Sequence, residues 1–177
     1  MMRDYAYPEP LNIGKASVEA FANQVAQKLA FRPGDDIVKP VKKLGGKIVA
    51  GSTGDEDIQS GSMIARSLSD FIIYVSPFTS LERDRFTIAH ELGHLLLHLP
   101  KVLQAKPDAV MRATRHVDNT DERQRRAEWE ANWFAAAFLM PAAEFQVEFG
   151  RGVEHVQRTF KVSSSAAEAR AKSLGLA

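Results

Sequence analysis

The sequence predicts an α+β fold in which a small three-stranded antiparallel sheet lies beside a mostly helical body. Two patterns favour this fold: several long segments repeat apolar residues at helical spacing, and three short strand-like segments follow one another between residues 47 and 75. The length of 177 residues fits one domain, since domains commonly contain about 100–200 residues. We therefore interpret residues 1–177 as a single domain.

The first third of the chain contains the predicted strands. Residues 1–14 contain prolines and show no period, which predicts an irregular N-terminal arm. A helix is expected from Ser17, an N-cap residue, to Leu29, and Pro33-Gly34 ends its pattern. One short helix and the three strands should follow, at Ile37–Leu44, Lys47–Gly51, Gly61–Arg66 and Phe71–Val75.

The longest helix is predicted over residues 80–99. Thr79-Ser80-Leu81-Glu82 is a T-x-x-E capping box at its start, and Pro100 should end it because proline cannot continue a helix. Caps, prolines and glycines predict further helices over 120–140, 141–150 and 163–175. With the segment 153–160, the last of these forms a predicted C-terminal helical hairpin over 153–176.

Composition excludes several functional classes. There is no cysteine, which excludes disulfides, thiolate zinc sites and cysteine nucleophiles, so any metal must be held by His, Asp or Glu. The 23 basic and 22 acidic residues nearly cancel, so we expect neither direct nucleic-acid binding nor attraction to anionic membranes. The apolar run Trp133–Met140 is too short to cross a bilayer, and Met1–Pro10 lacks the apolar stretch of a secretory signal. These features predict a soluble cytoplasmic protein.

An H-E-x-x-H motif, His90-Glu91-Leu92-Gly93-His94, lies well inside the predicted 80–99 helix. At about 100° per residue the two imidazoles and Glu91 share one sector of the helix. Leucine and isoleucine fill the opposite sector, at Leu81, Ile88, Leu92, Leu95 and Leu99. Two imidazoles one turn apart can bind a single zinc ion, while Glu91 beside the metal can act as a base. The motif therefore predicts a zincin-like active-site helix.

A catalytic zinc usually has three protein ligands, so one more is needed. Glu130 falls within the apolar stripe of the 120–140 helix, where a carboxylate needs a partner, and we predict it as the third ligand. Glu128 sits about 200° around the helix from Glu130 and is expected to face away. The alternative for Glu130 is an ordinary surface ion pair. Zn²⁺ suits two imidazoles and one carboxylate, and Mn²⁺ and Fe²⁺ are also compatible with them.

Three other residues are candidates for stabilising an oxyanion. His98 lies on the same helix face as the motif but about 12 Å along the axis from His90, which favours a place at the rim or behind the ligands over metal binding. His116 lies in a basic connector, and Tyr74 ends a predicted strand. For each of the three, an ordinary structural role is the alternative.

The chain resembles the ImmA/IrrE family of zinc-dependent, gluzincin-like metallopeptidases. The similarity rests on three blocks and extends over about residues 17–176: Arg85–His98 around the motif, Glu130–Pro141, and the C-terminal segment Phe160–Leu176. It implies zinc bound by His90, His94 and Glu130, with Glu91 as the catalytic acid/base. Phe138 departs from the family's usual leucine, and the connector between His94 and Glu130 cannot be transferred from relatives.

The resemblance also implies a substrate. Family members cleave helix-turn-helix repressors of the Xre type, so the predicted function is a zinc-dependent endopeptidase that relieves repression. An alternative is a toxin or binding module of a toxin-antitoxin pair, which complexes an Xre-type partner without proteolysis. A third hypothesis is DNA binding by the 153–176 hairpin, whose spacing is similar to a helix-turn-helix, although the near-zero net charge counts against it.

Overall fold

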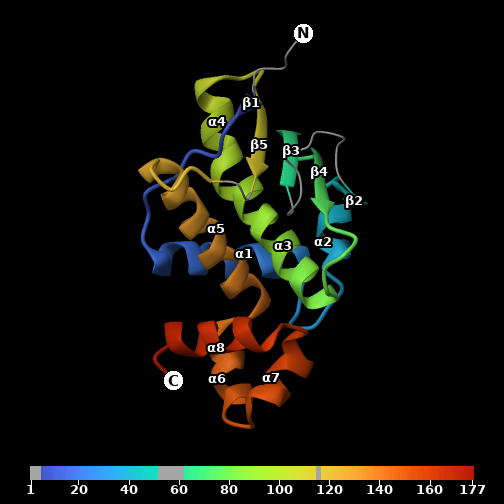
Figure 1. Ribbon diagram of the computed structural model, residues 1–177, viewed down its shortest axis with the longest axis vertical. Helices are drawn as coiled ribbons and strands as arrows, with labels where there is room; N and C mark the ends of the chain where they lie inside the picture. The colour runs from blue at the N-terminus through green and yellow to red at the C-terminus, as the bar shows by residue number, and fades with distance from the viewer. Residues whose placement is uncertain (1–4, 52–61, 115–116) are drawn as a thin grey trace.

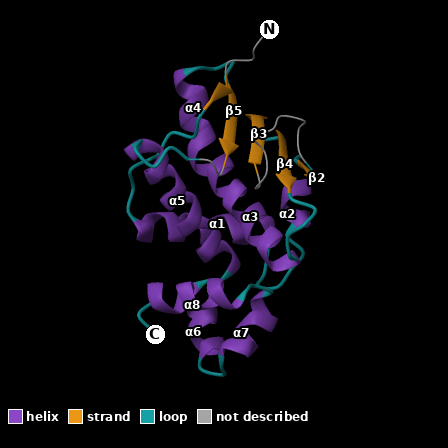
Figure 2. Cartoon of the chain, viewed as in Figure 1, coloured by secondary structure: helices purple, strands orange, loops and turns teal. Residues whose placement is uncertain are grey.

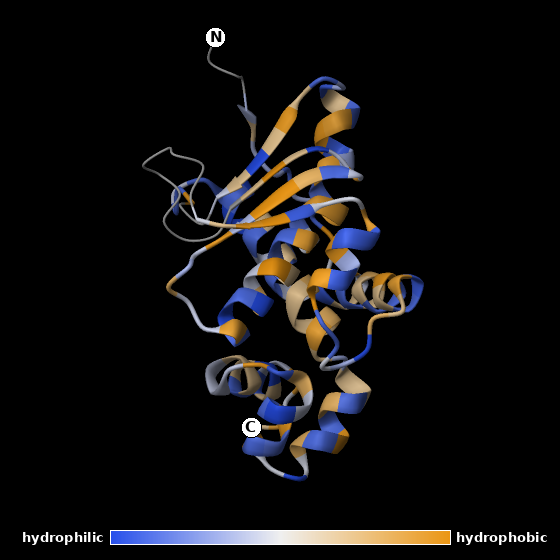
Figure 3. Cartoon of the chain, turned by 90° about the vertical axis from the view of Figure 1, so that its right-hand side faces the viewer, coloured by the Kyte–Doolittle hydropathy of each residue, from blue (hydrophilic) through white to orange (hydrophobic). Residues whose placement is uncertain are grey.

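The computed structural model describes residues 5–51, 62–114 and 117–177, and it has the predicted mostly helical α+β architecture (Figure 1). Figure 2 shows the strands gathered at one end of the molecule and the C-terminal helices at the other, with long helices between them. Figure 3 shows that the sheet is largely hydrophobic, whereas most helices alternate hydrophobic and hydrophilic segments. The central helices therefore have apolar faces available for packing.

The sheet differs from the predicted three antiparallel strands. The described residues form five strands in the order β1-β5-β3-β4-β2: β1 Tyr5–Ala6, β2 Lys47–Ala50, β3 Ser62–Ser67, β4 Asp70–Val75 and β5 Val110–Thr114. Strand β3 pairs antiparallel with β4 and β5, whereas β2 runs parallel to β4 and β1 runs parallel to β5. The three-stranded antiparallel prediction was therefore wrong. Strand β2 lies beside β4 because both edges of β3 are already paired.

The helices follow the predicted order. They are α1 Lys15–Leu29, α2 Val38–Lys43, α3 Leu81–Gly93, the π-helix η1 His94–His98, α4 Leu99–Ala105, α5 Glu122–Leu139, α6 Ala142–Phe149, α7 Val153–Phe160 and α8 Ser164–Ser173. The side chain of Ser80 caps α3, and that of Ser163 caps α8, by accepting from backbone N–H groups. The side chain of Asp121 caps α5 in the same way.

The motif helix continues beyond its expected end. It passes through η1, where the Leu99 N–H donates to the His94 carbonyl, and then into α4, which contains Pro100 in its first turn. Proline lacks an N–H and is tolerated in a first turn, so the π turn allows the chain to continue past Pro100. The prediction that Pro100 ends the helix was wrong for this reason.

Close packing joins α3 to α5. A Cβ added at Gly93 would lie only 3.1 Å from the Cα of Ala131 and 3.2 Å from the Cβ of Phe134. The absence of a side chain at Gly93 thus lets the two helices approach closely. Of the predicted apolar face of the motif helix, Leu81 is instead 84% exposed at the helix start. The rest of that face is buried, at Ile88, Leu92, Leu95 and Leu99.

No helix within the described parts of the chain is both long and apolar enough to span a membrane.

Candidate metal centre

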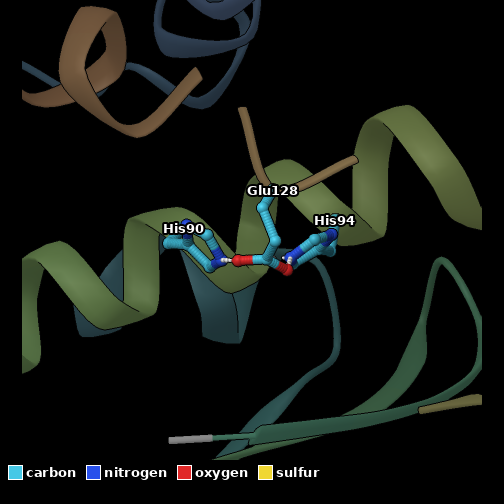
Figure 4. Close-up of side chains that lie close together, drawn as sticks. All are labelled: His90, His94 and Glu128. Carbon is cyan, nitrogen blue, oxygen red and sulfur yellow. Dashed lines mark hydrogen bonds and ion pairs between the residues drawn. The ribbon is translucent and has the colours of Figure 1, made fainter. Parts of the chain in front are cut away.

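Three potential metal ligands converge where the motif helix meets α5. His90 lies in the last turn of α3, His94 begins the π turn that follows α3, and Glu128 lies on α5 (Figure 4). The Nε2 atoms of the two histidines are 3.0 Å apart. The two carboxylate oxygens of Glu128 lie 3.2 Å from His90 Nε2 and 3.0 Å from His94 Nε2. All three residues offer one ligand atom to a common point.

These distances suit a zinc ion. In a tetrahedral site with zinc–ligand bonds of about 2.0–2.1 Å, ligand atoms are about 3.3 Å apart. The three side chains therefore need to separate by only a few tenths of an ångström to enclose the ion. Two imidazoles and a carboxylate leave a fourth position open for water or substrate, as catalytic zinc sites do.

The structure corrects the predicted positions of the two α5 carboxylates. Glu128 approaches the imidazoles, whereas Glu130 is fully buried and contacts His98, with 3.0 Å between Oε2 and Nε2. The expectation that Glu128 faces away was wrong. Both acids lie about 80° from the centre of the apolar stripe of α5, on opposite edges, so helical periodicity did not determine which edge faces the motif.

Electrostatics favour an ionised Glu128 carboxylate and a neutral His94 imidazole. Burial alone would raise the pKa of Glu128, but its contacts with His90 and His94 lower that pKa below its usual range. Burial lowers the pKa of His94 to about 3, with the nearby His90 acting in the same direction. At neutral pH the centre therefore offers a negative charge and at least one neutral imidazole, which are the forms that bind divalent cations.

Asn132 supports the His90 ring. Its side-chain Oδ1 lies 2.9 Å from His90 Nδ1, and an amide oxygen can only accept, so Nδ1 donates and Nε2 keeps its lone pair toward Glu128. Sequence reasoning missed this residue. The available signal was its spacing, because Asn132 follows Glu128 by four residues and so lies one turn along the same helix edge.

The other predicted residues occupy different positions. Glu91 is 1% exposed and lies on α3 beside His90 in sequence. His98 is completely buried and contacts Nδ1 of His94, so a substrate cannot reach it. Tyr74 lies on the face of β4 opposite to its buried residues, away from the core on which α3 packs. His116 lies outside the described residues.

A cleft of about 860 Å³ opens beside the centre. Its lining includes His90, Glu128 and Asn132, together with residues of α8 that are mainly serine and alanine. The apolar part of the lining comes from Phe86, Trp133, Ala136 and Met140. The candidate centre is therefore accessible from a groove large enough for a peptide segment.

Comparisons with known proteins identify the family and the fold of the chain. Residues 42–172 match the family model described as the IrrE N-terminal-like domain, Peptidase M78. A "Mycobacterium tuberculosis transcriptional regulator" has a similar structure, with a TM-score of 0.58 and 16% sequence identity, over 86% of this chain and 45% of that one. At this identity the likeness concerns the fold alone, and the chain spans less than half of that regulator. No curated protein gives a significant sequence match. The family match covers the motif, α5 and most of α8, and the chain belongs to the ImmA/IrrE family, which is of metallopeptidase type.

Proposed function

We propose that the protein is a zinc-dependent endopeptidase that cleaves a helix-turn-helix repressor of the Xre type. The observation that carries this proposal is the convergence of His90, His94 and Glu128 within bonding range of one cation, beside an open cleft. We propose these three as the zinc ligands, with Glu128 taking the place first expected for Glu130. The family match supports a peptidase.

Glu91 is proposed as the catalytic acid/base. A zinc ion bound at this centre would lower the pKa of a water molecule toward neutrality and polarise the scissile carbonyl. Glu91 accepts the proton of the attacking water and then returns it to the leaving amine. The buried surroundings of Glu91 exclude bulk water, which would otherwise compete for that proton.

The cleft beside the centre is the proposed substrate site. Its apolar lining, from Phe86, Trp133 and Met140, suits the side chains of a peptide segment. Helix α8, which forms one wall, is a poor candidate for reading DNA, because its Arg170 is 2% exposed and donates to the Met140 carbonyl and to Glu19. The proposed partner of this surface is therefore a protein.

Cleavage of a purified candidate repressor tests the function. Wild type should cut it with zinc bound, and Glu91→Gln should retain zinc but lose at least about 100-fold of the cleavage rate, the usual contribution of a general base. His94→Ala should lose both zinc and cleavage. Undiminished cleavage by Glu91→Gln would contradict the mechanism. Zinc binding and a stable repressor complex without cleavage would instead favour the binding-module alternative.

A further inference from the structure

A chain of hydrogen bonds runs from the candidate metal centre into the protein interior. His94 Nδ1 lies 3.0 Å from His98 Nδ1, and His98 Nε2 lies 3.0 Å from Glu130 Oε2. None of these three side chains is more than 1% exposed. Water therefore does not compete for these bonds, and each proton in the chain is held between two protein atoms.

The chemistry of the last acceptor sets the direction of every bond. An ionised carboxylate can only accept, so His98 Nε2 must donate to Glu130. A neutral imidazole with its proton on Nε2 has a lone pair on Nδ1, so His98 Nδ1 accepts from His94 Nδ1. The neutral His94 ring then has its lone pair on Nε2, which is the atom that faces Glu128.

Glu130 is itself held firmly. Its carboxylate accepts from the backbone N–H groups of Leu11, at 2.8 Å, and Asn12, at 2.7 Å, and from Arg126 Nε at 3.2 Å. Asn12 has a φ of 58°, a left-handed conformation that asparagine adopts more readily than most residues. With the bond from His98, four donors converge on one buried carboxylate, which favours its charged form.

The π turn belongs to the same arrangement. It spans His94–His98, so the two bonded rings mark its first and last residues. Helix α5 contributes Glu128 to the centre from one edge and Glu130 to the hydrogen-bond chain from the other. Both carboxylates that sequence reasoning weighed as ligands therefore act on His94, Glu128 by direct contact with its Nε2 and Glu130 through His98.

We propose that His98 and Glu130 are positioning residues that fix the tautomer and orientation of His94, so that its Nε2 is ready to bind a divalent cation. The proposal rests on the proposed function only in requiring that the centre holds such a cation. Outer partners of this kind usually change metal affinity 10- to 100-fold when they are removed. The residues that hold Glu130, Leu11 and Asn12, precede the segment matched by the family model.

Two measurements on the full chain test this proposal. The zinc dissociation constant of wild type is compared with those of Glu130→Gln and His98→Phe, and ¹⁵N NMR of the metal-free proteins reports which ring nitrogen of His94 carries the proton. Both variants should bind zinc about 10- to 100-fold more weakly. The wild-type His94 ring should be protonated at Nδ1, and His98→Phe, which removes the acceptor, should yield a mixture of tautomers.

Glu19→Gln is the matched control. It also neutralises a glutamate that pairs with a buried side chain, since Glu19 lies 2.7 Å from Arg170, but it does not contact the hydrogen-bond chain. We expect it to lower thermal stability while leaving zinc affinity and the His94 ring signals unchanged. The proposal would be overturned if Glu130→Gln and His98→Phe both bound zinc as tightly as wild type and the His94 tautomer were unchanged in His98→Phe. If wild type itself binds no zinc, the proposed function fails, whereas the NMR comparison still tests the hydrogen-bond chain.

Discussion

Replacement of Gly93 by alanine tests how closely α3 must approach α5 for the metal centre to form. The added Cβ would lie 3.1 Å from Ala131 Cα and 3.2 Å from both Ala131 O and Phe134 Cβ, so α5 must shift by a few tenths of an ångström. Such overpacking costs about 1–3 kcal/mol, and the helix preference of alanine over glycine returns about 1 kcal/mol. The net loss of stability should therefore be about 0–2 kcal/mol.

Zinc affinity should fall even though the net loss of fold stability is small. Glu128 precedes Ala131 by three residues on α5, so a shift of α5 moves the carboxylate away from His90 and His94. Functional sites tolerate displacements of only about 0.5 Å, and we expect zinc affinity to fall about tenfold, or about 1.4 kcal/mol. Chelator competition measures the affinity, and urea unfolding of the metal-free protein measures the stability.

Gly150→Ala is the control for this substitution. Gly150 has a helical φ of −60°, and an added Cβ would meet nothing closer than the Val147 carbonyl oxygen at 3.4 Å. Zinc affinity should not change in this variant. If Gly93→Ala instead stabilised the protein by about 1 kcal/mol, as helix propensity alone predicts, and bound zinc normally, the inferred tight contact would be refuted.

Three further predictions follow from the site. Glu128→Ala should abolish stoichiometric zinc binding in equilibrium dialysis, and retention of one zinc per chain would contradict the ligand set. Burial lowers the pKa of His94 to about 3, so between about pH 6.5 and pH 3 the unfolded chain binds a proton that the folded chain does not. The free energy of unfolding of the metal-free protein should therefore fall by up to about 1.4 kcal/mol per pH unit for this group as the pH falls toward 3. Denaturant midpoints between pH 7 and 5 measure this loss, which a flat profile would disprove. Ala169→Trp, on the exposed α8 wall of the cleft, should raise KM for a repressor substrate at least tenfold with zinc affinity intact, and unchanged KM would place the substrate elsewhere.

Helices could be predicted well from this sequence because their signals are local. Ser163 caps α8 as its position indicates, and the stripe behind the motif is buried apart from Leu81, although Ser80 rather than Thr79 of the predicted capping box caps α3. The strands were harder to predict, since β1 has two residues and β5 lies in a connector between helices. Neither strand is long enough to show a clear alternation of apolar and polar residues, and both gain their backbone hydrogen bonds only by pairing with strands distant in sequence.

The positions of Glu128 and Glu130 were hard to predict for a different reason. Helical periodicity identifies which face of α5 is apolar, but Glu128 and Glu130 flank that face symmetrically. The choice depends on which edge of α5 packs toward His90, and that is set by the contact of Gly93 with Ala131 rather than by the pattern within α5. The buried Glu130 did need partners, as reasoned, and they are His98, Arg126 and the backbone of Leu11 and Asn12.

The position of Gly93 within the motif connects packing to chemistry. It lies immediately before His94, and its contact with α5 brings both carboxylates of that helix to the level of the histidines. A larger residue there would separate Glu128 from His90 and His94, and Glu130 from His98, in the same movement. The spacing of α3 and α5 therefore controls the position of the proposed ligand Glu128 and the hydrogen-bonded support of His94 together, so substitutions at this contact should weaken zinc binding as well as the fold.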